Sequence, residues 1–255
     1  MSRHGRLMGR AMMAALFASG LLACGNTTTS SVRPTVTPTQ SGSAAPDTQR
    51  PACLDPGEGR IVVRPTSNGQ QTRILLLGTG TRGVVLAPQT NGGICQWLFL
   101  ARHLAARGYR TAAMDYWSDR YDEDMANAVT VVRTAGASRV ALVGASRGAI
   151  VALGSAHTYR PRIVGVVSVG AAPSEVDGYP TVTSLVTYRG PLLLMSSRDE
   201  SFAPASVTRR IAAAHPGGEQ VVIWSGTDHG VSLFMGPHEQ QVTATVDRFL
   251  ARVLR

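Results

Sequence analysis

The chain has 255 residues, of which 44% are hydrophobic, and a formal net charge of +9. This length and composition exclude a wholly disordered or fibrous chain and leave room for one domain with a sizeable core. Every basic side chain is an arginine, because the sequence contains no lysine. The arginines are scattered and no nucleic-acid recognition motif is present, so we expect no nucleic-acid partner, whereas attraction to an anionic surface stays open.

The first 23 residues have the pattern of a secretory signal peptide. Three arginines without an acid are followed by the apolar run AMMAALFASGLLA, which is too short to span a bilayer as a stable anchor. The run ends in LLAC, which resembles the lipobox of bacterial lipoproteins, a motif cut before a cysteine whose thiol carries a diacylglycerol. We therefore expect Cys24 to be lipidated and to anchor the protein to the outer face of the bacterial cell membrane. The alternative is an ordinary signal peptide with a nearby cysteine and a secreted protein.

Residues 24–52 are rich in Thr, Ser and Pro and offer little for a core to bury. Such a segment cannot offset the entropy lost on ordering, so it predicts a flexible tether before a globular domain over residues 53–255. The two cysteines of that domain, Cys53 and Cys95, either form a disulfide that closes a loop of 42 residues (95 − 53) or are unrelated thiols. The sequence leaves both arrangements open.

Apolar strands alternate with helical patterns along the whole domain. This order predicts a mostly parallel sheet with helices on both faces, in which the short link Asn68–Gln71 makes the first strand pair antiparallel. In such sheets chemistry collects beyond the carboxyl ends of the strands. The expected strands are Ile61–Arg64, Arg73–Leu77, Val84–Ala87, Arg110–Met114, Arg139–Val143, Ile163–Val169, Leu192–Ser196 and Gln220–Trp224. The expected helices are Gln96–Arg107, Asp122–Gly136, Ser146–Tyr159, Pro204–His215 and His238–Leu254.

The stretch VALVGASRGAIVAL, from Val140 to Leu153, predicts a buried strand, a very tight turn and a helix. Such a turn puts Ser146 at its apex and leaves no room for side chains at Gly144 and Gly148. The hydroxyl of Ser146 would then stand at the carboxyl edge of the sheet, beside a helix N-terminus. The pattern G-x-S-x-G is that of a nucleophile elbow, although small-residue turns without catalysis share it.

Two further loops at the same edge supply the groups that a serine nucleophile needs. Asp199 follows the apolar segment PLLLMSS, and His229 lies in the loop after the last expected strand. A serine hydroxyl becomes nucleophilic when a neutral imidazole takes its proton, and a carboxylate holds that imidazole in the right tautomer. We therefore expect Ser146, Asp199 and His229 to converge. Glu175 and Asp177, after the sixth strand, are the competing carboxylates, while Asp115 is expected to be structural.

Together these motifs resemble the α/β-hydrolase family over essentially the whole domain. The resemblance rests on the segments GVVLAPQTNGGICQW, LAARGY, TAAMD, GASRG, PLLLMSSRD and GTDHG in this order. It implies an α/β-hydrolase fold with an eight-stranded, mostly parallel sheet and no large lid, similar to dienelactone-hydrolase-like and small esterase members. It also implies an oxyanion hole formed by the backbone N–H of Arg147 and by that of Gln89 or Thr90. The chain departs from the family in having Pro88-Gln89 where many members have His-Gly.

The resulting functional prediction is a serine hydrolase that cleaves a small carboxylic ester or acyl substrate through an acyl-enzyme. The short stretch before Pro191 predicts an open site, whose apolar walls would come from Trp97, Trp117, Phe202 and Phe234 unless these are ordinary core residues. No metal-binding, phosphate-loop or dinucleotide motif is visible, so we expect no metal, no cofactor and a monomeric protein. The alternatives are an acyltransferase or thioesterase with the same triad, and a catalytically silent lipoprotein that binds a partner in the cell envelope.

Overall fold

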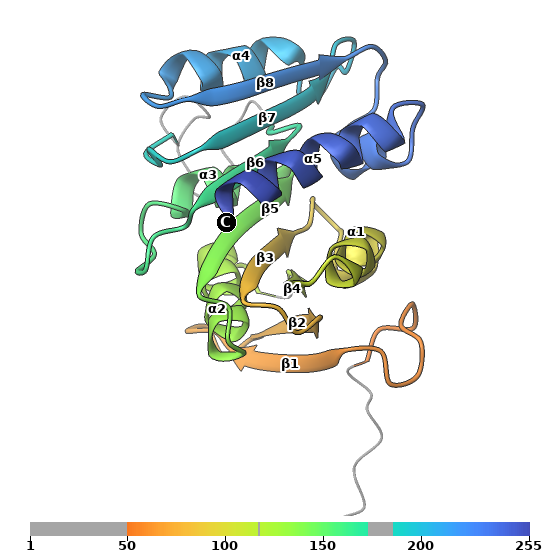
Figure 1. The fold of residues 1–255 in the computed structure, drawn as a ribbon, viewed down its shortest axis with the longest axis vertical. Helices are drawn as coiled ribbons and strands as arrows, with labels where there is room; N and C mark the ends of the chain where they lie inside the picture. Colours follow the sequence, from red (N-terminus) through yellow and green to blue (C-terminus); the bar gives the residue numbers. More distant parts are fainter. Residues whose placement is uncertain (1–49, 117, 173–185) are drawn as a thin grey trace, which may run out of the picture. The chain divides into compact units, whose positions relative to one another are not determined.

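A computed structural model describes residues 50–116, 118–172 and 186–255 (Figure 1). The expected signal peptide, Cys24, nearly all of the expected tether, and Trp117, Glu175 and Asp177 lie outside the described residues. Most of the segment between β6 and β7, on which the expectation of no large lid depends, also lies outside them. No helix of the described residues is long and apolar enough to cross a membrane.

The described strands form one sheet in the order β1-β2-β4-β3-β5-β6-β7-β8. β2 is antiparallel to both β1 and β4, and all the remaining neighbours are parallel. Every strand and helix that the sequence predicts is present. The strands are β1 (Arg60–Pro65), β2 (Gln71–Leu77), β3 (Arg82–Ala87), β4 (Tyr109–Met114), β5 (Arg139–Ala145), β6 (Gly165–Val169), β7 (Leu192–Ser197) and β8 (Glu219–Trp224). The helices are α1 (Ile94–Ala106), α2 (Tyr121–Thr134), α3 (Arg147–Ser155), α4 (Ala205–Ala214), α5 (Glu239–Val253) and a short 3-10 helix, η1 (Gly230–Phe234).

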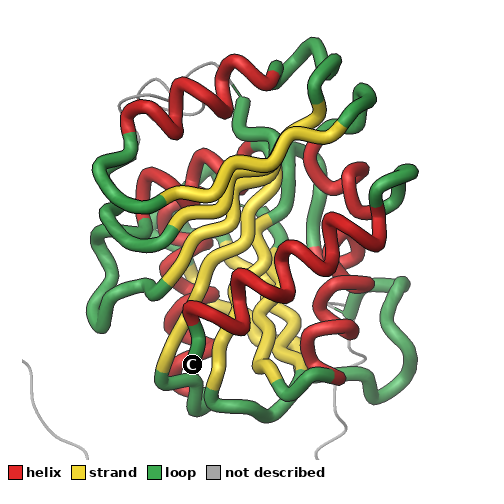
Figure 2. The backbone as a smooth tube through the Cα atoms, turned by 45° about the horizontal axis from the view of Figure 1, so that its top comes forward, coloured by secondary structure: helices red, strands yellow, loops and turns green. Residues whose placement is uncertain are grey.

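Helices cover both faces of the sheet (Figure 2). α1, α5 and η1 pack on one face around a core that includes Trp97 and Phe234, whereas α2, α3 and α4 pack on the other face around Met125 and Ile150. β6 and β7 are buried along their whole length, which explains why they appear in the sequence as continuous apolar runs. Trp97 and Phe234 are fully buried, so of the two roles that the sequence leaves open for them, pocket wall or core, they have the core role.

A disulfide joins Cys53 to Cys95 in the first turn of α1, with Cα atoms 5.8 Å apart. Of the two arrangements that the sequence leaves open, the structure therefore has the bond. Arg102 of the same helix adds ion pairs to Asp55 at 3.0 Å and to Glu58 at 2.6 Å. The segment that precedes β1 is thus fastened to α1 by one covalent bond and two surface contacts.

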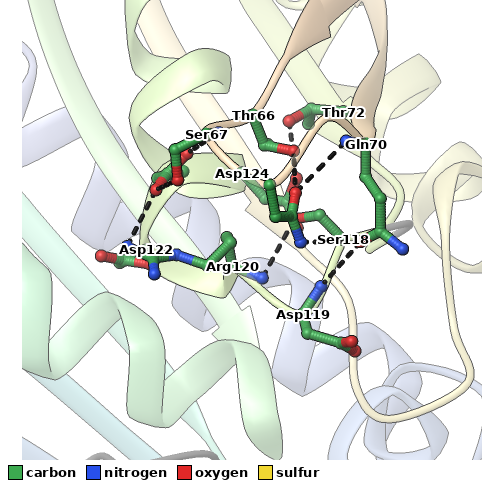
Figure 3. A network of polar contacts seen from close by, with 11 residues as sticks. Thr66, Ser67, Gln70, Thr72, Ser118, Asp119, Arg120, Asp122 and Asp124 are labelled. Atoms are coloured by element: carbon green, nitrogen blue, oxygen red, sulfur yellow. Dashed lines mark hydrogen bonds and ion pairs between the residues drawn. The ribbon is translucent and has the colours of Figure 1, made fainter. Parts of the chain in front are cut away.

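A buried polar network joins the start of α2 to the β1–β2 hairpin (Figure 3). The carboxylate of Asp124 is fully buried and accepts hydrogen bonds from the hydroxyls of Thr72, at 2.6 Å, and Ser118, at 2.9 Å. Asn127 donates to Thr72 Oγ1 at 2.9 Å, which leaves the Thr72 proton to point at the carboxylate. Burial raises the pKa of Asp124 to about 6, because the loss of solvation outweighs the two hydroxyl hydrogen bonds.

The raised pKa of Asp124 makes the stability of the fold depend on pH. Folding favours the protonated acid, so this contribution is fully present below about pH 4 and is lost as the pH rises through about 6. We expect the free energy of unfolding of the wild type, relative to that of Asp124→Asn, to fall across this range, because asparagine does not titrate. Urea unfolding at a series of pH values measures the difference, with Asp119→Asn as an exposed control that makes the same change in net charge. A difference that stays constant with pH would contradict the assignment.

Candidate active site

Ser146 lies on a tight turn between β5 and α3, with backbone angles φ 50° and ψ −113°. A positive φ strains a residue that carries a side chain, so the surrounding packing must hold it there. A Cβ at Gly144 would lie 2.2 Å from the carbonyl oxygen of Gly148, and a Cβ at Gly148 would lie 2.3 Å from that of Ala87. Both glycines are therefore required by the close approach of strand, turn and helix, as the sequence predicts.

Arg147 is the first residue of α3, so its backbone N–H has no acceptor within the helix. Its guanidinium group donates a hydrogen bond to the hydroxyl of Tyr121 at 2.9 Å and lies over the ring of that tyrosine, 4.6 Å from the centroid. The side chain of Arg147 is thus held by the start of α2. Its backbone lies beside Ser146 at a helix N-terminus, where partial positive charge favours an anion.

His229 lies in the loop between β8 and η1, and its ring is held by a buried carboxylate. His229 Nδ1 is 3.1 Å from Oε2 of Glu200, which follows β7. Glu200 also accepts hydrogen bonds from the backbone N–H groups of Phe202 and Ala203, each at 2.5 Å. A carboxylate at Nδ1 keeps the proton on that nitrogen and leaves Nε2 as the acceptor, which is the form a general base requires.

The carboxylate at His229 is one residue later in the chain than the sequence predicts. Asp199 is exposed, and its N–H donates to the carbonyl oxygen of Gly226 at 3.0 Å, which prolongs the pairing of β7 with β8. The chain turns after this hydrogen bond, and Glu200 is the side chain that turns inward. The prediction that Asp199 contacts His229 is therefore wrong. The competing carboxylates Glu175 and Asp177 lie outside the described residues.

Side chains from two other strand ends hold the loop of His229 in place. The hydroxyl of Ser197, at the end of β7, donates to the carbonyl oxygen of Asp228 at 2.8 Å. Oε1 of Gln89, after β3, accepts a hydrogen bond from the N–H of Val231 at 3.2 Å. The backbone is thus fixed on both sides of the histidine. Sequence reasoning considered only the backbone of Gln89 and missed this use of its side chain.

The loop after β3 packs directly against the elbow and carries the N–H groups considered for an oxyanion hole. The N–H of Gln89 already donates to Oε1 of Gln96 at 3.1 Å. Within residues 50–116, 118–172 and 186–255, no acceptor is found for the N–H of Thr90. Asp115, at the end of β4, accepts a hydrogen bond from the N–H of Ile94 at 2.7 Å and so fixes the start of α1, where this loop ends. Asp115 is a structural carboxylate, as the sequence predicts.

The loops that carry Ser146 and His229 both lie against the end of β6. The N–H of Ser146 donates to the carbonyl oxygen of Val169 at 2.9 Å, and a Cβ at Gly170 would lie 3.4 Å from His229 Nδ1. No hydrogen bond joins the serine hydroxyl to the imidazole among the described residues. Catalytic hydrogen bonds are often long in the absence of substrate and shorten in the complex, so the proximity of the two loops is the informative observation.

The exposed ring of Phe202 is the apolar surface found next to the histidine. Its centroid lies 5.4 Å from that of the imidazole of His229 in an edge-on arrangement, and the residue is 59% exposed. Phe202 is thus placed where the sequence predicts an apolar wall, whereas Trp97 and Phe234 are not and Trp117 is not described. No group of three His, Cys, Asp or Glu side chains able to hold a metal ion occurs in the part of the chain that the structure covers.

Neither a protein-family model nor a curated protein matches the sequence, but many solved structures match the fold. An esterase of Pyrococcus furiosus has a TM-score of 0.66 at 14% identity, over 78% of this chain and 92% of that one. Est1E of Butyrivibrio proteoclasticus has a TM-score of 0.63 at 13% identity, over 75% and 98%. The α/β hydrolase domain-containing protein 10 of mouse has a TM-score of 0.62 at 10% identity, over 76% and 99%. This chain has the α/β-hydrolase fold.

In this α/β-hydrolase fold, three loops at the carboxyl edge of the sheet supply the polar groups of the candidate site. The loops after β5, β7 and β8 carry Ser146, Glu200 and His229. The same edge contains the N–H groups of Thr90 and Arg147. The arrangement therefore contains a strained serine, a histidine whose Nδ1 faces a carboxylate, and backbone N–H donors at the same edge of the sheet as the serine.

Proposed function

We propose that this chain is a serine hydrolase that cleaves carboxylic esters through an acyl-enzyme. The observation that carries the proposal is the strained backbone of Ser146, at φ 50°, which the close contacts at Gly144 and Gly148 maintain. Strain of this kind costs about 1–3 kcal/mol and is concentrated at functional sites. A serine forced to the apex of such a turn, close to a histidine that Glu200 holds, is what nucleophilic catalysis requires.

The proposed reaction has two halves, formation and hydrolysis of the acyl-enzyme, and in each half His229 takes up one proton and gives it back. Ser146 Oγ attacks the ester carbonyl while His229 Nε2 takes its proton, and Glu200 stabilises the imidazolium through Nδ1–H. The N–H groups of Arg147 and Thr90 hold the oxyanion, where one such donor contributes about 3–4 kcal/mol to transition-state stabilisation. His229 then gives its proton to the departing alcohol. In the second half His229 Nε2 takes a proton from a water molecule, whose oxygen attacks the carbonyl of the acyl-enzyme. The acid is released, and His229 returns the proton to Ser146 Oγ.

The reactivity of Ser146 separates this proposal from a catalytically silent binding protein. We expect the purified protein to be labelled by a fluorophosphonate probe and labelling to vanish in Ser146→Ala, because the probe bonds only to an activated serine. Mass spectrometry of the labelled peptide locates the adduct. A folded wild-type protein that takes up no label would favour the silent alternative.

A labelled enzyme would then be tested on ester and thioester substrates, with and without an alcohol acceptor, which separates hydrolysis from thioesterase and acyltransferase chemistry.

Glu200 and its neighbour Asp199 form a matched pair of variants. We expect Glu200→Gln to lower the labelling rate by about 10²- to 10⁴-fold, because the amide no longer holds the required tautomer of His229. Asp199→Asn removes the same charge from an exposed position and should change the rate less than about threefold. Stopped time courses of labelling give both rates. A larger loss of labelling rate in Asp199→Asn than in Glu200→Gln would identify Asp199 as the carboxylate that orients His229.

We further propose that the protein is exported and anchored to the outer face of the bacterial cell membrane through a lipid on Cys24, with residues 24–52 as its tether. The support is the order of three features in the N-terminal segment: arginines without an acid, then an apolar run, then the LLAC motif. Metabolic labelling with a fatty acid should mark the wild type but not Cys24→Ala. Equal labelling of both proteins, or soluble release of the unlabelled wild type, would rule out this anchor and leave the secreted form.

A further inference from the structure

The amino ends of the parallel strands, opposite the active site, carry a row of arginines, and this side of the sheet is called its edge here. β4, β3, β5, β6 and β7 are parallel neighbours, so their first residues lie along one edge and their last residues along the edge that contains the serine and the histidine. Strands lie about 4.8 Å apart, so these five starts extend over roughly 20 Å. The basic edge is defined here by the arginines at or next to these starts, Arg82, Arg110, Arg139, Arg160, Arg162 and Arg189. The next parallel strand, β8, begins with a carboxylate, Glu219, which lies 3.7 Å from His215 and bounds the basic edge on that side.

The arginines of the basic edge have no carboxylate partner within residues 50–116, 118–172 and 186–255. Within the described residues, none of its six arginines forms an ion pair. Four of them, Arg82, Arg110, Arg139 and Arg160, donate hydrogen bonds to backbone carbonyl oxygens instead. Arg110 donates to Gly80 at 2.9 Å, and Arg139 donates to Val253 at 2.9 Å. A carbonyl oxygen orients a guanidinium group but leaves its full positive charge in place.

Two of these arginines are the first residues of neighbouring strands. Arg82 of β3 and Arg139 of β5 are Cα partners in the parallel pairing. Two positive charges at neighbouring strand starts repel each other. A partner that brings negative charge to this edge would convert the repulsion into attraction.

A cavity at the same edge has the chemistry of an anion site. It has a volume of about 220 Å³ and lies between the end of α3 and the start of β7. Arg160, Arg162, Arg189 and His157 are among its lining residues, and no carboxylate of the described chain lines it. Guanidinium groups suit phosphate because their planar donors match two of its oxygens at once. The volume is enough for a phosphate group with a few water molecules.

We propose that the basic edge docks on an anionic lipid bilayer and that its cavity accepts the phosphate of a lipid headgroup. The bilayer is favoured over nucleic acid because proteins that bind single strands stack bases on exposed aromatic rings. The large exposed hydrophobic residues of the described chain are Phe202, Val221 and Met235, and none of them lies at the basic edge. A lipid on Cys24 would keep the domain within reach of the bilayer, so weak electrostatic contacts would suffice to dock it.

Binding to vesicles tests the docking without involving the hydrolase reaction. The full chain carries Cys24→Ser in every protein, so that no lipid anchor contributes. The edge variant Arg160→Gln/Arg162→Gln/Arg189→Gln is compared with a control, Arg198→Gln/Arg209→Gln/Arg210→Gln, which removes the same charge from exposed positions outside the edge. Co-sedimentation uses vesicles of one part phosphatidylglycerol to two parts phosphatidylcholine, with pure phosphatidylcholine as background.

We expect the edge variant to lose roughly a hundredfold in partition coefficient, about fivefold for each arginine, and the control to lose less than about threefold. Binding of the wild type should weaken as salt is added. Equal losses in both triple variants, or undiminished binding to pure phosphatidylcholine, would overturn the proposal. Tighter binding of an RNA or DNA strand than of vesicles at the same salt would replace the bilayer with nucleic acid. If the edge variant does not fold, Arg189→Gln alone should still show the fivefold loss, and an unchanged partition coefficient would reject the proposal.

Discussion

The contact of backbone against backbone at Gly144 and Gly148 is the constraint on which the rest of the site depends. It brings β5, the turn and α3 so close together that Ser146 must adopt a positive φ. The carbonyl of Ala87 rests against Gly148, which places the loop after β3 next to the serine. From that loop the side chain of Gln89 reaches the backbone beyond His229. A single close approach therefore sets the spacing of Ser146, the loop after β3 and the loop that carries His229.

The parallel sheet supports this arrangement by ending three strands beside one another. The loops after β7 and β8 are joined by side-chain hydrogen bonds, from Ser197 to Asp228 and between Glu200 and His229. Such ties reduce the entropy that would be lost on ordering the site around a substrate. The same topology gathers the strand starts at the far edge, where arginines without carboxylate partners accumulate. The proposed reaction and the proposed docking thus use opposite ends of the same strands.

Much of this could be predicted because the decisive residues have local reasons to be where they are. Continuous apolar runs indicated the buried strands, and the glycines around Ser146 indicated the turn. The prediction failed where orientation depends on a neighbour. Asp199 and Glu200 are adjacent, and contacts with distant residues, Gly226 for Asp199 and His229 for Glu200, accompany the inward turn of Glu200. In the same way, an apolar residue such as Trp97 has the same sequence pattern in a core as in a pocket wall. The raised pKa of Asp124 arises from contacts with a hairpin distant in sequence, which no local pattern reveals.

The disulfide between Cys53 and Cys95 has a mechanical consequence. β1 is an edge strand whose one strand neighbour in the described sheet is β2, so tension applied to its first residue would break this pairing one hydrogen bond at a time. Cys53 precedes β1 in the chain, so a pull from the N-terminal side reaches the sulfur–sulfur bond first. The load then passes into α1 and the core beneath it, and β1 carries none of it. A force applied from the N-terminal side of Cys53 would therefore not detach β1, the outermost strand, from the sheet.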